Sequence, residues 1–414
     1  MILLTLALIV LSAYVLSKQF NQPRNITLLF MAQPLVMCSA PIIVFIGGIL
    51  SSQLTSNESL ATLPISLMIL GVATGVIPAA MIAKKQGRKF AVFTGFSTLI
   101  IAALIASASA LIASFELFAF ASFLIGVGGA FTQQLRFAAI ESTANAENIP
   151  KTLSILMLSG VFAAFLGPEI AVVAKNWLSS PHGYAGSFLF LAGLIVIAAL
   201  IMLFFNNPES TEEVNTGESR SLTTIIKQPI FIIAICSATI GFALMSYLMT
   251  ATPLSMHHMQ GHSLNDTKWV IQTHIAAMYL PSLITPFIIK RIELKGLLVV
   301  GTLVYSVVAV ITLSGQHVIH YWWALLLLGV GWNFLFLTGT SLLPQSYEAC
   351  ERHKVQATND FILFGFQAFA SLMAGWVLFN QGWNWVVMSS LPFIIGLFFI
   401  AWYYQHLSKQ KCLV

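Results

Sequence analysis

The sequence has 414 residues, of which 58% are apolar and only 8% are charged, and its formal net charge is +5. Soluble domains carry about 25% charged residues, so this composition excludes a soluble enzyme and requires lipid as the solvent for most of the surface. The four cysteines form no closely spaced pair of the metal-binding type and are too few for a disulfide scaffold.

An apolar run at residues 1–16 begins the chain. It lacks the basic segment that precedes the apolar stretch of a secretory signal. As a helix it would measure about 24 Å, a little short of a full bilayer span. Two interpretations stay open, namely a thirteenth spanning helix with its N-terminus outside and an extension that lies at the membrane surface.

Twelve further apolar runs are long enough to cross a bilayer, which takes about 20 residues per helix. In chain order, we predict spanning helices at 27–50, 62–83, 90–113, 116–141, 152–174, 185–205, 229–254, 269–289, 296–314, 321–343, 357–379 and 385–405. The longest polar connection divides them six and six and carries four glutamates, which favours a solvated linker. The predicted organisation is an N-terminal extension at 1–25, six-helix bundles at 26–205 and 229–405, a linker at 206–228 and a tail at 406–414.

Basic residues orient the predicted helices. Of the 19 lysines and arginines, all except Lys175 and Lys268 fall on one side. Cytoplasmic loops of membrane proteins are enriched in these residues, so we expect this side, with the linker and the tail, in the cytoplasm of a bacterium and the helices in its inner membrane. The positive net charge reflects this orientation, and we expect no nucleic-acid partner.

The two predicted bundles repeat each other. A basic loop follows the second helix, at 80–89, and another follows the eighth, at 286–295. A Gly-Val-Gly segment in the fourth helix recurs in the tenth, each followed three residues later by a phenylalanine: Gly126 to Gly128 with Phe131, and Gly329 to Gly331 with Phe334. Two parallel six-helix repeats explain this correspondence.

The basic loop after the second helix carries the most specific motif. Ile82, Ala83, Lys85, Gly87, Arg88 and Lys89 follow the pattern G-x-L-A-D-R-x-G-R-K, whereas Ala80 and Lys84 replace its first glycine and its aspartate. With this motif, residues 20 to 405 resemble the major facilitator superfamily of secondary transporters. The resemblance implies an all-α membrane fold of two pseudo-symmetric six-helix repeats that works by alternating access. The family's arginine in the fourth helix is replaced by Ser122.

Polar side chains on the first, fourth, seventh and tenth helices are the substrate-binding candidates, because the resemblance implies that these helices line a central cavity. They are Gln33, Gln133, Gln134, Arg136, Tyr247, Trp332 and Asn333. Phenylalanine and methionine are abundant nearby, which favours a small amphipathic organic solute. The alternative for Arg136 is that it extends to the membrane surface, or pairs with Glu141 or with another helix.

Two titratable residues within predicted helices, Glu169 and His274, are candidates for proton coupling. A carboxyl group removed from water takes up a proton more readily, and imidazole titrates near neutral pH. The alternative for each is a hydrogen bond that only joins helices.

A gate at the cytoplasmic side is predicted from the exchanged charges of the basic loop. Asp360 near the start of the eleventh helix could pair with Lys84, with Lys85 and Arg88 as alternative partners. The alternative is that Lys84 only sets the topology and that Asp360 interacts with the positive end of its own helix.

Three histidines near the outer end of the seventh helix, His257, His258 and His262, are weak candidates for metal ligands. The alternative, a polar loop with an apolar rim, requires no metal. We predict no metal site and no cofactor.

The predicted function is that of a monomeric, proton-coupled secondary transporter, either symporter or antiporter, whose partners are a small-molecule substrate, protons and the lipid bilayer. The polar residues within the helices form none of the reactive groupings of an enzyme. Two alternatives stay open: an importer of a metal chelate or siderophore-like compound, and a receptor of the same fold that transports nothing.

Overall fold

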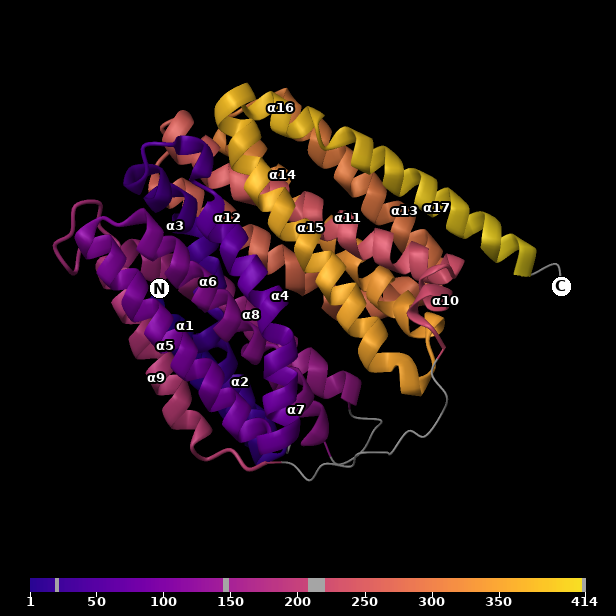
Figure 1. The fold of residues 1–414 in the computed structure, drawn as a ribbon, viewed down its shortest axis with the longest axis horizontal. Helices are drawn as coiled ribbons and strands as arrows, with labels where there is room; N and C mark the ends of the chain where they lie inside the picture. The colour runs from indigo at the N-terminus through magenta and orange to yellow at the C-terminus, as the bar shows by residue number, and fades with distance from the viewer. Residues whose placement is uncertain (19–21, 144–148, 208–219, 412–414) are drawn as a thin grey trace.

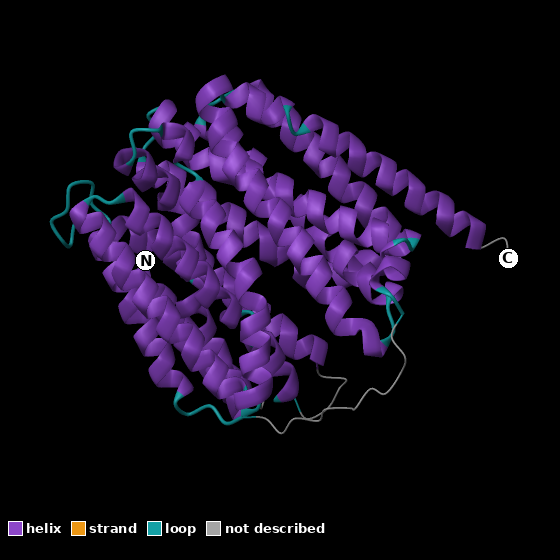
Figure 2. Ribbon diagram, in the orientation of Figure 1, coloured by secondary structure: helices purple, strands orange, loops and turns teal. Residues whose placement is uncertain are grey.

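Helices make up nearly all of the chain. The computed structural model describes residues 1–18, 22–143, 149–207 and 220–411, and these residues contain no strand (Figure 2). Ten helices in this part of the chain are long and apolar enough to cross a membrane. The two remaining predicted spans also form helices, which confirms the predicted all-α membrane fold.

The N-terminal half contains the first six predicted spans. Its helices are α2 (Arg24–Met37), α3 (Ser39–Leu54), α4 (Leu63–Gln86), α5 (Arg88–Ile112), α6 (Phe115–Thr132), α7 (Leu135–Glu141), α8 (Ile149–Val173) and α9 (Ala185–Met202). Two spans that the sequence predicts as continuous are interrupted. α2 and α3 meet at Cys38, between two prolines that each remove a backbone donor, and α6 ends just after two glycines that weaken a helix.

The C-terminal half contains the other six. Its helices are α10 (Leu222–Ile226), α11 (Pro229–Pro253), α12 (Leu264–Tyr279), α13 (Thr285–Ser314), α14 (Val318–Leu342), α15 (Arg352–Gln381), α16 (Trp383–Met388) and α17 (Leu391–Lys411). The eighth and ninth spans meet inside α13, where Glu293 has φ 57°. Within the predicted linker, residues 208–219 lie outside the described residues.

The two halves lie side by side (Figure 1). We call the end of the bundle where α4 turns into α5, and where α15 begins, the linker end, because the linker between the halves attaches there. We call the opposite end, where α3 leads to α4 and α8 leads to α9, the distal end. Between the halves, α3, α4 and α8 pack against α11, α12 and α15.

The predicted repeat is visible in the packing of the Gly-Val-Gly segments. A Cβ atom on Gly126 would lie 1.9 Å from the carbonyl oxygen of Met68 in α4, and one on Gly329 would lie 2.7 Å from that of His274 in α12. The second glycine of each segment packs against the third span of its half, where the nearest atoms belong to the side chains of Leu99 and Tyr305. Equivalent glycines therefore bring equivalent helices into backbone contact.

Residues at the N-terminus form α1 (Ile2–Lys18), which packs against α2 and α8. Ile9 and Ala13 face the bundle and are buried, whereas Leu3, Leu4 and Leu11 are exposed. An apolar exposed face on a 17-residue helix suits contact with lipid.

Candidate functional site

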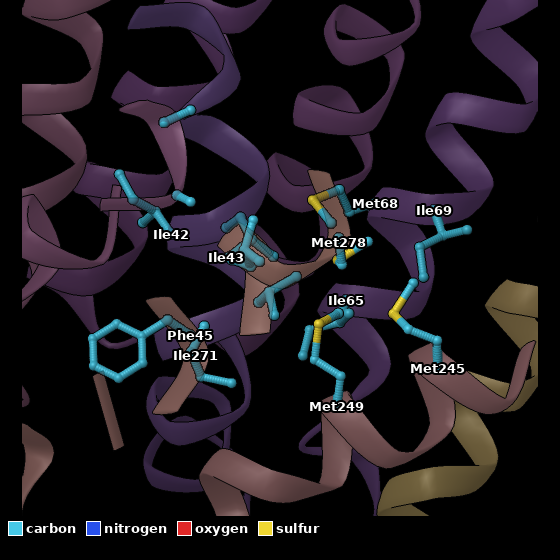
Figure 3. Packing of buried hydrophobic residues seen from close by; sticks show 14 of the residues in the cluster. Ile42, Ile43, Phe45, Ile65, Met68, Ile69, Met245, Met249, Ile271 and Met278 are labelled. Carbon is cyan, nitrogen blue, oxygen red and sulfur yellow. The ribbon is translucent and has the colours of Figure 1, made fainter. Parts of the chain in front are cut away.

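The halves meet in an apolar layer of branched and flexible side chains. Ten of them on α3, α4, α11 and α12 are labelled in Figure 3, and all are at least nine-tenths buried: Ile42, Ile43, Phe45, Ile65, Met68, Ile69, Met245, Met249, Ile271 and Met278. We call this set the seal. Methionine adapts its shape to changing neighbours, so a methionine-rich layer can repack if the halves move relative to each other.

An ion pair joins the halves on the distal side. Lys268 Nζ of α12 lies 2.8 Å from Glu169 Oε2 of α8, and both side chains are largely buried. The sequence singled out Glu169 but not its partner. The other distal lysine, Lys175, lies over the ring of Tyr184, 4.8 Å from its centroid.

Further polar contacts close the same end. Gln272 Nε2 donates to the carbonyl oxygen of Phe165 at 2.8 Å, and Thr62 Oγ1 donates to that of Leu372 at 3.2 Å. Asn380 Nδ2 donates to Ser59 Oγ at 3.0 Å, and His258 Nε2 lies 3.5 Å from Glu58 Oε1. All of these contacts join the N-terminal half to the C-terminal half, so the distal end is closed in this structure.

The other two candidate histidines are bonded within the distal loops. His257 Nδ1 lies 2.9 Å from the carbonyl oxygen of His262, and His262 Nε2 lies 2.8 Å from that of Gln316. Among the residues placed by the structure, no three His, Cys, Asp or Glu side chains are grouped as a metal ion would require.

At the linker end, the basic loop is bound to its own half. Gly87 has φ 88°, in the left-handed region that favours glycine, and starts α5. Arg88 donates through Nε to Glu141 Oε2 at 2.9 Å and through Nη1 to Gln134 Oε1 at 2.8 Å. The partner of Glu141 is thus Arg88. Lys85 is exposed, and the side chain of Lys84 lies outside the described residues.

Opposite charges on the two halves attract each other near the linker end. Arg136 on α7 interacts electrostatically with Asp360 on α15. Asp360 Oδ1 also accepts a hydrogen bond from Asn359 Nδ2 at 3.1 Å. Arg136 is solvent-exposed, as is Gln133, which follows the last residue of α6. Asp360 is therefore within electrostatic range of Arg136, and its pairing with Lys84 stays a prediction.

One stripe of α15 leads from this charge interaction to the distal end. Asp360, Phe364, Gln367, Ser371 and Gly375 recur every three or four residues, so they share one helix face. The stripe spans about 22 Å at 1.5 Å per residue. Its distal member, Gly375, approaches Thr62 of α4 so closely that a Cβ atom would lie 2.5 Å from the threonine hydroxyl. The distal end of the stripe therefore contacts the N-terminal half, whereas Phe364 and Ser371 contact α11 of the C-terminal half.

Four aromatic rings form a cluster beside this stripe. Phe242 of α11 makes edge contacts with Trp332 at 5.0 Å, Phe336 at 5.5 Å and Phe364 at 6.2 Å between ring centroids. Trp332 and Phe336 of α14 are stacked at 5.0 Å with an angle of 7° between their planes. We call these four rings the aromatic cluster. Phe242 precedes Met245 by three residues on α11, so the cluster lies next to the seal on its linker side.

Three further predicted binding residues are hydrogen-bonded inside their own halves. Gln33 Nε2 donates to the carbonyl oxygen of Leu156 at 3.2 Å, and the Tyr247 hydroxyl lies 2.8 Å from Ser389 Oγ. Asn333 Nδ2 donates to the carbonyl oxygen of Met278 at 2.8 Å and to Ser282 Oγ. These bonds join neighbouring helices within one half.

His274, the second candidate for proton coupling, is fully buried. Its Nδ1 atom lies 2.7 Å from the carbonyl oxygen of Leu325, which joins α12 to α14 within the C-terminal half. Glu169 and His274 therefore differ in position: the carboxylate lies between the halves, and the imidazole lies within one of them.

An ion pair that the sequence did not indicate joins the end of the linker to the C-terminal half. Arg220 contacts both carboxylate oxygens of Glu351, at 2.8 and 2.6 Å, and its backbone N–H donates to Oε1 at 2.8 Å. The backbone N–H of Glu348 donates to the same carboxylate at 2.9 Å. The Arg220 side chain and these N–H groups lower the pKa of Glu351 to about 2.

Known proteins resemble this chain over nearly its whole length. The sequence model of the Major Facilitator Superfamily matches residues 26–364. The riboflavin transporter RfnT of Brucella anthropi is 34% identical over 377 residues, which cover 90% of this chain and 94% of RfnT. The uncharacterized MFS-type transporter YddS of Bacillus subtilis is 27% identical over 89% of this chain and 88% of its own length. The crystal structure of the nucleoside transporter NupG has a TM-score of 0.69 and 12% identity, covering 92% of this chain and 99% of NupG, which shows a shared fold.

Proposed function

This chain belongs to the Major Facilitator Superfamily and is a multi-pass membrane transporter rather than an enzyme, and from this premise we propose that it transports riboflavin or a closely related flavin. The observation that carries the proposal is the 34% identity to a riboflavin transporter over 90% of this chain. Riboflavin has a planar fused ring and a polar sugar-alcohol chain, so it is a small amphipathic organic solute of the predicted kind.

The arrangement of the site supports this substrate class. Phe364 of the aromatic cluster lies one helical turn from Asp360, which interacts with Arg136. A planar ring can pack on the aromatic cluster while its polar chain reaches the charged groups and Gln133. An amphipathic solute matches this sequence of apolar and polar surroundings.

The contacts between the halves support alternating access. In the proposed cycle the distal contacts break and the linker end closes, with Asp360 pairing with Arg136 or with Lys84 or Lys85 of the basic loop. We assign the linker end to the cytoplasm and the helices to the inner membrane of a bacterium, because the basic residues gather at that end.

We assign proton coupling to Glu169. The ion pair with Lys268 joins the halves, so it has to break before the distal end opens. Protonation of Glu169 removes the negative charge and weakens this pair, which links proton binding to opening. His274 is the second candidate, although its one described bond lies within the C-terminal half.

The test is uptake of radiolabelled riboflavin into proteoliposomes that contain the purified protein. We expect an imposed pH gradient to drive accumulation of riboflavin. The variant Glu169→Gln should lose gradient-driven accumulation but retain exchange of internal for external riboflavin, because exchange needs no net proton movement. Glu116→Gln changes an exposed distal carboxylate and should behave as wild type.

Other results would decide against parts of this proposal. Failure of the wild-type protein to bind or transport riboflavin would exclude the flavin assignment, and transport of ferric siderophores in the same vesicles would favour the metal-chelate alternative. Binding of riboflavin with no transport would favour the receptor alternative. Equal gradient-driven accumulation by Glu169→Gln would exclude Glu169 as the coupling residue.

A further inference from the structure

Four buried polar atoms on the three helices that carry the aromatic cluster have no hydrogen-bond partner among the residues that the structure describes. They are Trp332 Nε1, Thr239 Oγ1, Ser246 Oγ and Gln367 Oε1. Each of the four side chains is more than nine-tenths buried. Buried polar groups in folded proteins are almost always hydrogen-bonded, because an unpaired group loses its hydrogen bonds to water and gains none in the protein. A group of four such atoms therefore points to a partner that is not part of the chain.

Neighbouring hydroxyl groups on the same helix are satisfied inside the protein. Ser237 Oγ of α11 donates to the carbonyl oxygen of Leu335 at 2.8 Å, and Thr252 Oγ1 donates to that of Leu248 at 2.8 Å. Thr250 Oγ1 lies 3.1 Å from Ser371 Oγ of α15. Thr239 and Ser246 on α11 thus depart from the local pattern, so the helix environment alone does not explain them.

The helical spacing places the four side chains on the helix faces that carry the rings of the aromatic cluster. Thr239 lies three residues before Phe242 on α11, and Ser246 lies four residues after it, so both share the face of this phenylalanine. Gln367 follows Phe364 by three residues on α15 and precedes Ser371 by four, and both of these neighbours contact α11. Trp332 is itself a member of the aromatic cluster. The polar atoms therefore approach the cluster from three different helices.

Other buried polar atoms without a partner do not form such a group. Gln33, Gln272 and His274 each have one unpartnered atom, but the other polar atom of each side chain is hydrogen-bonded. The remaining unpartnered atoms all lie near the distal end, on Ser51, Ser180, Tyr184, His320, Trp322 and Trp383. Convergence on one cluster of rings distinguishes the four atoms on α11, α14 and α15.

We propose that these four atoms and the aromatic cluster bind a planar heteroaromatic ring through a polar edge that carries both a hydrogen-bond donor and an acceptor. The indole N–H of Trp332 can only donate, so the ligand supplies an acceptor there. Gln367 Oε1 can only accept, so the ligand supplies an N–H or O–H group. The hydroxyls of Thr239 and Ser246 can do either.

An imide or lactam edge, in which an N–H group lies beside a carbonyl, satisfies these requirements. The flavin ring has such an edge, with one N–H between two carbonyls. This inference rests on the proposed function and states which part of the substrate the C-terminal half recognises. The sugar-alcohol chain then extends toward Arg136 and Asp360 at the linker end.

Binding of three probes to the purified protein tests the proposal: riboflavin, lumiflavin, which has the ring without the sugar-alcohol chain, and 3-methylriboflavin, which lacks the N–H of the edge. Wild-type protein should bind lumiflavin, and methylation should weaken binding about tenfold, the effect of one lost hydrogen bond. Trp332→Phe, Thr239→Val, Ser246→Ala and Gln367→Leu should each weaken riboflavin binding by a similar factor.

The most specific test measures binding of riboflavin and of 3-methylriboflavin to the same protein variant. If Gln367 accepts from the N–H of the edge, Gln367→Leu should bind riboflavin and 3-methylriboflavin equally. Trp383→Phe and Thr252→Val make the same substitutions at buried positions outside the aromatic cluster, so they should keep wild-type affinity and discrimination. A thermal-unfolding scan of each variant identifies any that fails to fold.

The outcomes separate this proposal from the proposed function. Wild-type transport of riboflavin with unchanged binding in all four variants would overturn the edge-binding site and leave the flavin assignment intact. Binding of lumiflavin that depends on Trp332 and Gln367, without transport of riboflavin, would support the site and overturn the assignment. If none of the three probes binds to wild-type protein, both are wrong.

Discussion

Glu351 is a fully buried carboxylate at the start of α15, and its partners explain its protonation behaviour. It accepts hydrogen bonds from Arg220 and from the backbone N–H of Glu348. These donors favour the charged form and lower its pKa from 4.5 to about 2. The ion pair ties the last residues of the linker to the C-terminal half, so its loss should loosen this attachment.

The pH dependence of this ion pair follows from the lowered pKa. A group whose pKa is lower in the folded state stabilises that state above the unfolded-state pKa, and the contribution disappears as the pH falls through the folded-state pKa. We expect Glu351 to stabilise the protein fully above pH 4.5 and to lose this effect between pH 4.5 and about 2.

Glu351→Gln should lower the Tm in detergent by a few degrees at pH 7 and should flatten the fall of the Tm between pH 4.5 and 2. Thermal unfolding at a series of pH values measures both. Glu116→Gln, at an exposed site, should follow wild type at every pH. An equal acid-induced loss in wild type and Glu351→Gln would contradict the role of this ion pair.

The sequence indicated single charged residues better than their partners. Glu169, Arg136 and Asp360 stood out because charges within apolar helices are rare. Their partners could not be predicted, because Lys268 and Glu169 are 99 residues apart and meet only through the packing of two separate helical bundles. The motif predicts Arg88 as an alternative partner of Asp360 in a gate, which stays a prediction, and in this conformation Arg88 is bound to Glu141 and Gln134.

At the level of elements, glycine sets how closely the helices of each half approach. A methyl group on Gly329 would lie 2.7 Å from a carbonyl oxygen of α12, and one on Gly126 would lie 1.9 Å from a carbonyl oxygen of α4. Backbone atoms cannot rotate out of the way as a side chain can. Substitution therefore has to separate the two helices.

Gly126→Ala and Gly329→Ala should each destabilise the protein by about 1 to 3 kcal/mol, the usual cost of overpacking, with the larger effect at Gly126. Gly193→Ala is the matched control, because no atom lies within 4 Å of the added methyl group on α9. Equilibrium unfolding in mixed detergent micelles measures the three free energies. A cost at Gly193 equal to that at Gly126 would show that loss of glycine itself, rather than contact, is responsible.

The number and order of the helices could be predicted from the sequence, whereas their interruptions could not. Apolar length alone identifies a spanning helix, because the bilayer imposes the same requirement on every segment. The break between α6 and α7 lies inside the span predicted at 116–141, and Gln134 at this break is fixed by a bond to Arg88 from another helix. Contacts of this kind depend on tertiary packing.

For the whole molecule, the distal contacts define one conformation of the transporter. Ser59 and Asn380 are hydrogen-bonded across the two halves at 3.0 Å. A covalent link at this position should hold the distal end closed. Transport by alternating access requires this end to open, so the link should stop it.

A protein without its native cysteines and with Ser59→Cys and Asn380→Cys should lose more than nine-tenths of its transport when a short thiol cross-linker joins the two positions. Cleavage of the cross-link should restore activity. The control pair, Asn25→Cys and Ser142→Cys, lies within the N-terminal half at a side-chain hydrogen bond of 3.2 Å and should transport equally with and without the cross-link. Unchanged transport in the cross-linked first pair would contradict opening at the distal end.

The duplicated sequence predicts the two-bundle architecture, but only the structure shows which end of the bundle is closed. Equivalent glycines and basic loops recur in both halves, so the repeat can be recognised from residues alone. Which end is closed depends on contacts such as Thr62 with Leu372, and a sequence encodes more than one such state in a transporter.

The contrast between the glycine contacts and the seal has a mechanical consequence. Inside each half, Gly126 and Gly329 bring helix backbones into direct contact, so these helices can move little relative to each other. Between the halves, the seal contains four unbranched, flexible side chains, those of Met68, Met245, Met249 and Met278. We therefore expect deformation to concentrate in the seal during transport, so that each half turns as a rigid body and a small rotation gives a large displacement at the two membrane surfaces.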